Sequence, residues 1–140
     1  MNIDSTVRTG IVIDHITAGR AMRLYELLDL ESSEGSVAII KNVASSKMGK
    51  KDIIKIETDR TLDLDIIGYV DPDATVNIIR DGKLIEKKII GMPVELRDVI
   101  HCKNPRCITS VEQELPHVFH LTDPENHIYR CIYCETKANQ

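Results

Sequence analysis

The four cysteines of this 140-residue chain limit its possible folds more than any other feature. They form two close pairs, Cys102-x4-Cys107 and Cys131-x2-Cys134, and no cysteine precedes residue 102. Two tight turns that each present two thiolates supply the tetrahedral set of sulfur ligands that Zn²⁺ accepts. Because four cysteines close the coordination sphere and leave no position for water, the pattern predicts one structural Zn²⁺ ion per chain.

Two disulfides, or four unrelated thiols, are the alternative interpretation of these cysteines. Disulfides persist in oxidising compartments, and the first ten residues lack the basic patch and apolar run of a signal peptide. No apolar run approaches the length of about 20 residues that spans a membrane. We therefore expect a cytoplasmic protein with reduced thiols. Its cysteine-rich part is too small to bury a sufficient core, so we expect that part to unfold without the metal.

Upstream of the cysteines, β-branched runs alternate with segments that carry apolar residues at helical spacing. The dipeptide Asp81-Gly82 predicts a tight hairpin, because both residue types tolerate a positive φ. The predicted strands cover residues 10–16, 36–44, 51–58, 74–80 and 83–90, and the predicted helices cover residues 19–30 and 62–68.

This order of elements is typical of a ferredoxin-like split βαβ sandwich with one extra hairpin strand. The predicted fold class is therefore α+β: an antiparallel sheet with two helices on one face, followed by a small all-β zinc-binding domain. Gly91-Met92-Pro93 interrupts the pattern. We predict two domains there, covering residues 1–92 and 93–140.

Composition argues against nucleic acid as a partner. The net charge is −4, tryptophan is absent, and the chain has one Phe and four Tyr. Nucleic-acid-binding domains usually carry a basic surface, and readers of single strands stack bases on exposed aromatic rings. We expect neither nucleic acid nor a membrane among the partners.

A second group of candidate residues lies in the N-terminal part. It combines a cluster of lysines with a carboxylate and an imidazole at the end of the first predicted strand: Lys47, Lys50, Lys51, Lys55, Lys87, Lys88, Asp14 and His15. In a ferredoxin-like sheet these segments can converge near one end, where lysines would bind the phosphates of a nucleotide and Asp14 a ribose hydroxyl. The alternative is an ordinary solvated surface. No glycine-rich phosphate loop is present.

Nothing in the sequence indicates catalysis. The five histidines are scattered, and four of them lie in the cysteine-rich part, where an alternative metal ligand is conceivable. Ser45-Ser46 has no identifiable base partner, and no carboxylates are paired in a suggestive way. We predict that the chain is not an enzyme.

Several motifs occur together and in order along nearly the whole chain. They are Gly10-x-Val12-Ile13-Asp14-His15-Ile16, Met48-Gly49-x-Lys51-Asp52-x-Ile54-Lys55-Ile56-Glu57, Ala74-Thr75-Val76-Asn77, Cys-Lys-Asn-Pro-x-Cys-Ile-Thr at 102–109 and Cys131-x2-Cys134. In this combination the chain resembles the aspartate carbamoyltransferase regulatory chain.

The resemblance implies a non-catalytic, allosteric subunit of pyrimidine biosynthesis. Its first domain would bind ATP as activator and CTP, with UTP, as inhibitors, and its zinc domain would contact the catalytic chain. Six regulatory chains, paired as homodimers, would assemble with six catalytic chains. Nucleotide-site residues implied by matching motifs are Val12, Asp14, His15, Lys51, Lys55, Asn77, Ile79, Leu84 and Lys87. Backbone groups near Val7 and Ile79 would read the base edge, and Asn104 and Glu135 would touch the catalytic chain.

Two other classes of protein remain as alternatives. A zinc-ribbon adaptor or nucleic-acid-binding protein would account for the cysteines and lysines without any carbamoyltransferase partner. A small-molecule enzyme on a ferredoxin-like sheet would have to show turnover as an isolated chain.

Overall fold

The computed structural model describes residues 8–138. They form two compact units that divide between Gly91 and Met92. Each unit has its own sheet and its own buried apolar residues, and each is described separately below.

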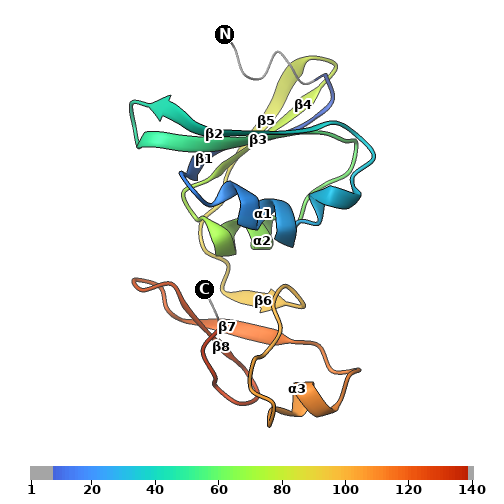
Figure 1. Cartoon of the computed structure of the whole chain (residues 1–140), viewed down its shortest axis with the longest axis vertical. Helices are drawn as coiled ribbons and strands as arrows, with labels where there is room; N and C mark the ends of the chain where they lie inside the picture. The colour runs from blue at the N-terminus through green and yellow to red at the C-terminus, as the bar shows by residue number, and fades with distance from the viewer. Residues whose placement is uncertain (1–7, 139–140) are drawn as a thin grey trace. The chain divides into compact units, whose positions relative to one another are not determined.

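The first unit is a five-stranded antiparallel sheet with two helices on one face (Figure 1). Its strands lie in the order β2-β3-β1-β4-β5. In chain order the elements are β1 (Gly10–Thr17), α1 (Ala21–Leu27), a 3₁₀ turn (Leu30–Ser32), β2 (Val37–Ser45), β3 (Gly49–Glu57), α2 (Leu64–Val70), β4 (Thr75–Arg80) and β5 (Lys83–Ile89).

This strand order is that of the split βαβ arrangement, and it confirms the predicted fold class. β3 lies between β1 and β2, while β4 pairs with the other edge of β1, so every neighbouring pair is antiparallel. β5 then returns from β4 as an extra edge strand. The hairpin turn between them has φ values of 51° at Asp81 and 78° at Gly82, as the dipeptide predicted.

The core of this unit lies between the sheet and the helices. Ile11 and Ile13 of β1 pair with Ile56 and Ile54 of β3, and all four are at most 5% exposed. They share one face of the sheet because alternate residues of a strand point the same way. Leu24 of α1 is fully buried against this layer. Burial of these isoleucines therefore determines which sheet face the helices cover.

The two helices begin and end differently from the prediction. The segment predicted as one helix over 19–30 stops at Leu27, because Asp29 takes a left-handed φ of 52° before the 3₁₀ turn. The second helix begins at Leu64 rather than 62. Asp63 caps it by accepting a hydrogen bond of 3.0 Å from the backbone N–H of Asp65. Local side-chain caps of this kind decide helix ends that apolar spacing leaves open.

The second unit is a small three-stranded antiparallel sheet, as predicted for the all-β part. Its strands are β6 (Glu95–Arg97), β7 (Val118–Asp123) and β8 (Ile128–Cys131), in the order β6-β7-β8. A one-turn helix, α3 (Ile108–Val111), follows Cys107 and was not predicted. The core consists of three large side chains that are at most 1% exposed: Leu96, Phe119 and Tyr129.

Candidate functional sites

The four cysteines of the second unit meet at one point. Their Sγ atoms all lie within 4.8 Å of one another, with 3.5 Å between Cys102 and Cys134 and 3.7 Å between Cys107 and Cys131. Four sulfurs at about 2.3 Å from a tetrahedral metal ion lie about 3.8 Å apart. The sulfur positions therefore fit one metal ion with no further protein ligand. Two turns supply them: the loop before α3, and the end of β8 with the turn after it.

The surroundings of these sulfurs differ in polarity. Burial raises the pKa of the Cys102 thiol to about 12. At Cys134 a hydrogen bond to the hydroxyl of Thr136, 3.2 Å from its Sγ, lowers the pKa to about 6. The hydroxyl of Thr109 donates to the Sγ of Cys107 at 3.1 Å. The two threonine hydroxyls are thus placed to support thiolate ligands.

The nearby histidines do not join the sulfur cluster. The Nδ1 atom of His117 accepts a hydrogen bond of 3.1 Å from the backbone N–H of Cys102. His101 packs edge-on against the His117 ring, with 4.5 Å between the ring centroids. Among the described residues, the group with metal-ligand geometry contains the four cysteines alone.

The two residues predicted to touch a catalytic chain lie beside the cysteine turns. Asn104 shapes the first turn: its side-chain oxygen accepts from the N–H of Arg106 at 3.0 Å, and its carbonyl accepts from the N–H of Cys107 at 3.0 Å. Glu135 follows the last cysteine with a φ of 63°, and its carboxylate lies 3.4 Å from the Nε2 atom of His120. Both residues therefore make contacts within the second unit, and their contact with a catalytic chain stays a prediction.

The predicted nucleotide residues of the first unit lie on the sheet face opposite the helices. One row crosses four strands, because Lys55 pairs with Val12, Val12 with Asn77, and Asn77 with Lys87. Directly paired residues in antiparallel strands project from the same face. The sequence predicted convergence near one end of the sheet. The structure instead places these side chains in a row across the sheet face opposite the helices, which we call the nucleotide face.

Two irregularities in the strands bring further predicted residues to the nucleotide face. In the bulge of β1, Asp14 and His15 together lie opposite a single residue of β3, and His15 takes a φ of 57°. A second bulge, in β5, falls between the pairs Ile78–Glu86 and Ile79–Leu84. Strict alternation would put residues 84 and 87 on opposite faces, so this bulge allows Leu84 and Lys87 to share one.

A charged cluster forms at the β1 bulge. Lys51 donates to the carboxylate of Asp14, with 2.9 Å from Nζ to Oδ1, and the backbone N–H of His15 donates to the same oxygen at 2.6 Å. Burial alone would raise the pKa of Asp14, but these two hydrogen bonds and the neighbouring positive charges hold it below its ordinary value. Asp14 is therefore ionised at neutral pH.

The imidazole of His15 is the third ionisable group of this cluster. Its Nδ1 atom lies 3.0 Å from the hydroxyl oxygen of Thr75, a neighbour that the sequence analysis did not select. Burial lowers the pKa of His15, and the charges of Lys51, Lys47 and Lys87 lower it further, against the opposing effect of Asp14. The same charges that disfavour a cation at this position would attract an anionic ligand.

Asn77 is a polar side chain with an unused acceptor at the centre of the row. It is 6% exposed, and its Oδ1 atom has no hydrogen-bond partner among the described residues. Its neighbour Val12 is completely buried, and Lys55 is 8% exposed. A buried amide oxygen without a partner is costly, so this atom marks a position where a ligand hydrogen bond would stabilise the fold.

Not every candidate residue reaches the nucleotide face. Lys88 pairs with Val76, and Lys50 pairs with Ala44, which puts both on the opposite side of the sheet. The lysines that cluster in the sequence are therefore divided between the two faces of the sheet. Val7, predicted to contribute a backbone contact, lies outside the described residues. Strand alternation alone could have placed Thr75 beside Asn77 and separated Lys87 from Lys88.

No helix among residues 8–138 is long and apolar enough to cross a bilayer.

Comparison with known proteins assigns both units. The family described as "Aspartate carbamoyltransferase regulatory chain, allosteric domain" matches residues 1–91, and "Aspartate carbamoyltransferase regulatory chain, metal binding domain" matches residues 94–140. A regulatory chain from Clostridium tetani is 50% identical over 133 residues, covering 94% of this chain and 92% of the relative. One from Clostridium botulinum strain Hall is 46% identical over 131 residues, covering 94% and 90%. One from Bifidobacterium longum is 42% identical over 134 residues, covering 96% of each.

Proposed function

We propose, from the premise that this chain belongs to the aspartate carbamoyltransferase regulatory chain family, that it binds ATP, CTP and UTP and transmits their presence to catalytic chains. Members of this family are regulatory chains of a pyrimidine biosynthesis enzyme and not its catalytic chains, which confirms the prediction of a non-enzyme.

The proposal of nucleotide binding rests on the row of residues across the nucleotide face. Lys55, Asn77 and Lys87 lie in one row on β3, β4 and β5, with Val12 of β1 between Lys55 and Asn77, and the Asp14–Lys51 pair is on the same face. The lysines would bind phosphates, and Asp14 would accept from a ribose hydroxyl.

The remaining contacts of this site would come from the apolar residues and the buried amide. Val12, Ile79 and Leu84 would contact the base and ribose, while His15 would approach the phosphates. Backbone groups at Ile79 would read the base edge. The unused Oδ1 atom of Asn77 supports this assignment, because it needs a donor from outside the described residues.

Zn²⁺ is the metal that the four cysteines would hold, one ion per chain. A set of four sulfur ligands with edges of 3.5 and 3.7 Å supports tetrahedral zinc over the octahedral, oxygen-preferring Mg²⁺ or Ca²⁺. A closed sulfur set supplies structure and no reactive position. The cysteine turns would thereby hold Asn104 and Glu135 at the surface that contacts the catalytic chain.

The assembly would be a cytoplasmic hetero-oligomer with the regulatory chains paired as homodimers. Nucleotide binding to residues 1–92 would favour one quaternary state, and residues 93–140 would pass that preference to the catalytic chains. Coupling of this kind amounts to about 1–3 kcal/mol and is reciprocal, so ligands of the catalytic chain would also change nucleotide affinity.

Calorimetric titration of the full chain with CTP and with ATP tests the proposal. We expect binding to wild type and at least about tenfold weaker binding to Lys87→Ala, because a charge-assisted hydrogen bond contributes about 1.5–3 kcal/mol. Lys88→Ala is the matched control. It removes the adjacent lysine on the opposite face and should leave nucleotide affinity unchanged. Absence of binding to wild type, or equal affinities of wild type and Lys87→Ala, contradicts the proposed site.

A further inference from the structure

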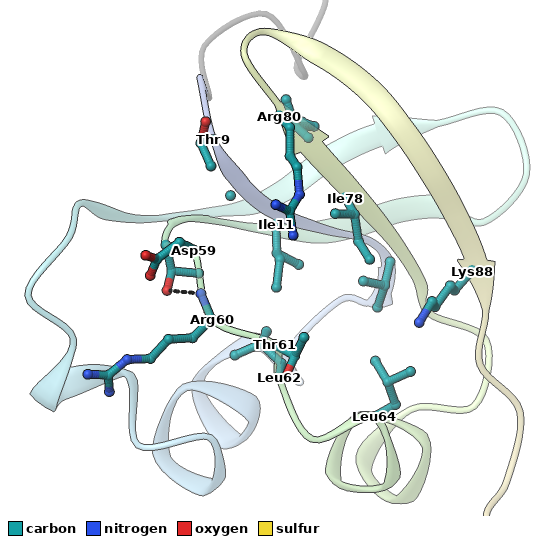
Figure 2. Close-up of a pocket in the computed structure, with 14 residues that line it drawn as sticks. Thr9, Ile11, Asp59, Arg60, Thr61, Leu62, Leu64, Ile78, Arg80 and Lys88 are labelled. Atoms are coloured by element: carbon teal, nitrogen blue, oxygen red, sulfur yellow. Dashed lines mark hydrogen bonds between the residues drawn. The ribbon is translucent and has the colours of Figure 1, made fainter.

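The sheet face that carries the helices is incompletely covered at β4 and β5. β5 is an addition to the split βαβ arrangement, and the two helices of this arrangement leave a cleft beside it. A cavity of about 80 Å³ lies there, bounded by β1, β4, β5, residues 58–62 and the start of α2 (Figure 2). It is on the opposite side of the sheet from the nucleotide face.

The walls of this cleft are apolar. Ile11, Val76 and Ile78 form the side made by the sheet, and Leu62 and Leu64 form the opposite side. Ile11 and Val76 are 5% and 1% exposed. A compact apolar group placed between these walls would lose its contact with water on both sides.

Two cationic side chains reach the same cleft. Arg80 shares a strand face with Val76 and Ile78 by alternation, and Lys88 pairs directly with Val76. Figure 2 shows the guanidinium of Arg80 extending toward Ile11 and the ammonium of Lys88 directed toward Leu64. The apolar walls thus have positive charge beside them.

The acidic residues near the cleft leave these charges largely uncompensated. Within residues 8–138, Arg80 has no ion pair or side-chain hydrogen bond, and Lys88 has only Glu86, 3.9 Å away and half exposed. Asp59 lines the far end, but Figure 2 shows its carboxylate directed away from Arg80. Arg60 also extends away from the cavity. An anion held by Arg80 and Lys88 therefore meets little competition from the protein.

We propose that this cleft binds a small monocarboxylate with a compact apolar body, such as benzoate or a branched-chain acid. The apolar body would lie between the isoleucine and leucine walls, with the carboxylate at the mouth between Arg80 and Lys88. A cavity that encloses a whole benzene molecule has roughly 150 Å³. The cleft, at about 80 Å³, takes part of such a ring and leaves the charged end at the open side. The site does not depend on nucleotide binding, which concerns the other face.

Titration of the full, zinc-loaded chain with benzoate, followed by methyl NMR, tests this proposal. We expect saturable shifts of the Ile11, Ile78 and Leu64 methyl groups, with an affinity of roughly millimolar strength for a ligand of this size. Acetate lacks the apolar body and benzyl alcohol lacks the charge. Each should bind at least about tenfold more weakly if both walls and cations contribute.

Neighbouring lysines on opposite faces provide the matched variants. Lys88→Gln and Arg80→Gln should each weaken benzoate binding at least about fivefold, whereas Lys87→Gln should leave it unchanged. In the nucleotide titration the expectations are reversed, because removal of Lys87 should weaken binding and removal of Lys88 should not. The two proposals can therefore fail separately. The inference is overturned if benzoate causes no saturable shift, if benzyl alcohol or acetate binds equally well, or if Lys87→Gln weakens benzoate as much as Lys88→Gln. An affinity that falls as protein concentration rises would mean that a second copy covers the cleft, and would also overturn it.

Discussion

At the scale of single residues, the electrostatics of the first unit centre on Asp14, His15 and Lys51. The carboxylate of Asp14 is held ionised by the ammonium of Lys51 at 2.9 Å, and both side chains are mostly buried, at 16% and 13% exposure. His15 lies in the same cluster, and burial together with the charges of Lys51, Lys47 and Lys87 lowers its pKa. A ligand that brought negative charge to this cluster would oppose that lowering.

The titration of His15 provides a test of this arrangement. Its pKa should lie below the ordinary value of 6.5, because burial and three lysines oppose protonation. Lys51→Met should raise that pKa by removing an opposing charge, and Asp14→Asn should lower it by removing a favourable one. NMR of the imidazole in the three proteins measures all three values. A pKa that rises in Asp14→Asn would contradict the assigned contacts.

The direction of the shift also determines how stability depends on pH. Because the folded pKa of His15 is depressed, the unfolded chain binds this proton more tightly than the folded chain. The contribution of His15 to stability is therefore fully present above pH 6.5 and is lost as the pH falls through the folded pKa.

At the scale of elements, bulges and the buried Asp52 determine the shape of the sheet. Asp52 of β3 is fully buried and accepts hydrogen bonds from the N–H groups of Gly19 at 2.9 Å, Ala21 at 3.4 Å and Asn42 at 3.0 Å. Gly19 and Ala21 flank the start of α1, and Asn42 lies in a bulge of β2 with a φ of 60°. One carboxylate thereby ties three elements together beside Lys51.

Asp52→Asn should destabilise the first unit by about 2–4 kcal/mol, because an amide NH₂ would face buried N–H donors and leave them unsatisfied. Urea unfolding of the full chain, followed by a probe in the first unit, measures the change. Asp63→Asn makes the same chemical change at an exposed helix cap, where Asn is also a good cap, and should change stability by less than about 0.5 kcal/mol. Equal effects of the two substitutions would contradict the role of Asp52.

At the scale of the whole molecule, the chain consists of two units that are stabilised differently. The first has a sheet-and-helix core with many fully buried isoleucines, whereas the second has three large core side chains beside the four cysteines. A core of that size rarely stabilises a fold without a metal or disulfides. We therefore expect that the second unit needs a bound metal in order to fold.

Chelation of the metal should unfold residues 92–140 and leave the first unit folded. In a mixed complex with the catalytic chain, the same treatment should release the regulatory chain, because the residues proposed to contact the catalytic chain, Asn104 and Glu135, lie on the cysteine turns. NMR signals of Phe119 and Tyr129 report the second unit, those of Ile13 and Ile54 report the first, and size-exclusion chromatography reports the complex. A complex that survives complete metal loss would contradict the expected role of the metal.

Thr109→Val, which removes the hydroxyl beside Cys107, should lower metal affinity about tenfold without abolishing folding.

Much of this organisation follows from local sequence. The spacing of Cys102, Cys107, Cys131 and Cys134 predicts a metal site because two tight turns are enough to present four sulfurs. The succession of strand and helix patterns predicts the α+β class, and Asp81-Gly82 predicts the hairpin, since turn conformation depends on a few adjacent residues. These inferences require no knowledge of which strands become neighbours.

Only the tertiary structure decides which side chains share a face. Leu84 and Lys87 share a side of the sheet because β5 contains a bulge, although strict alternation would place them on opposite sides. The same is true of Asp14 and His15, whose place beside Lys51 and Thr75 depends on the bulge in β1. Register and bulges arise from pairing between distant segments. For this reason the sequence by itself determined the cysteine cluster and the fold class, while the tertiary structure decided which sheet face carries the predicted nucleotide residues and where the cleft behind it lies.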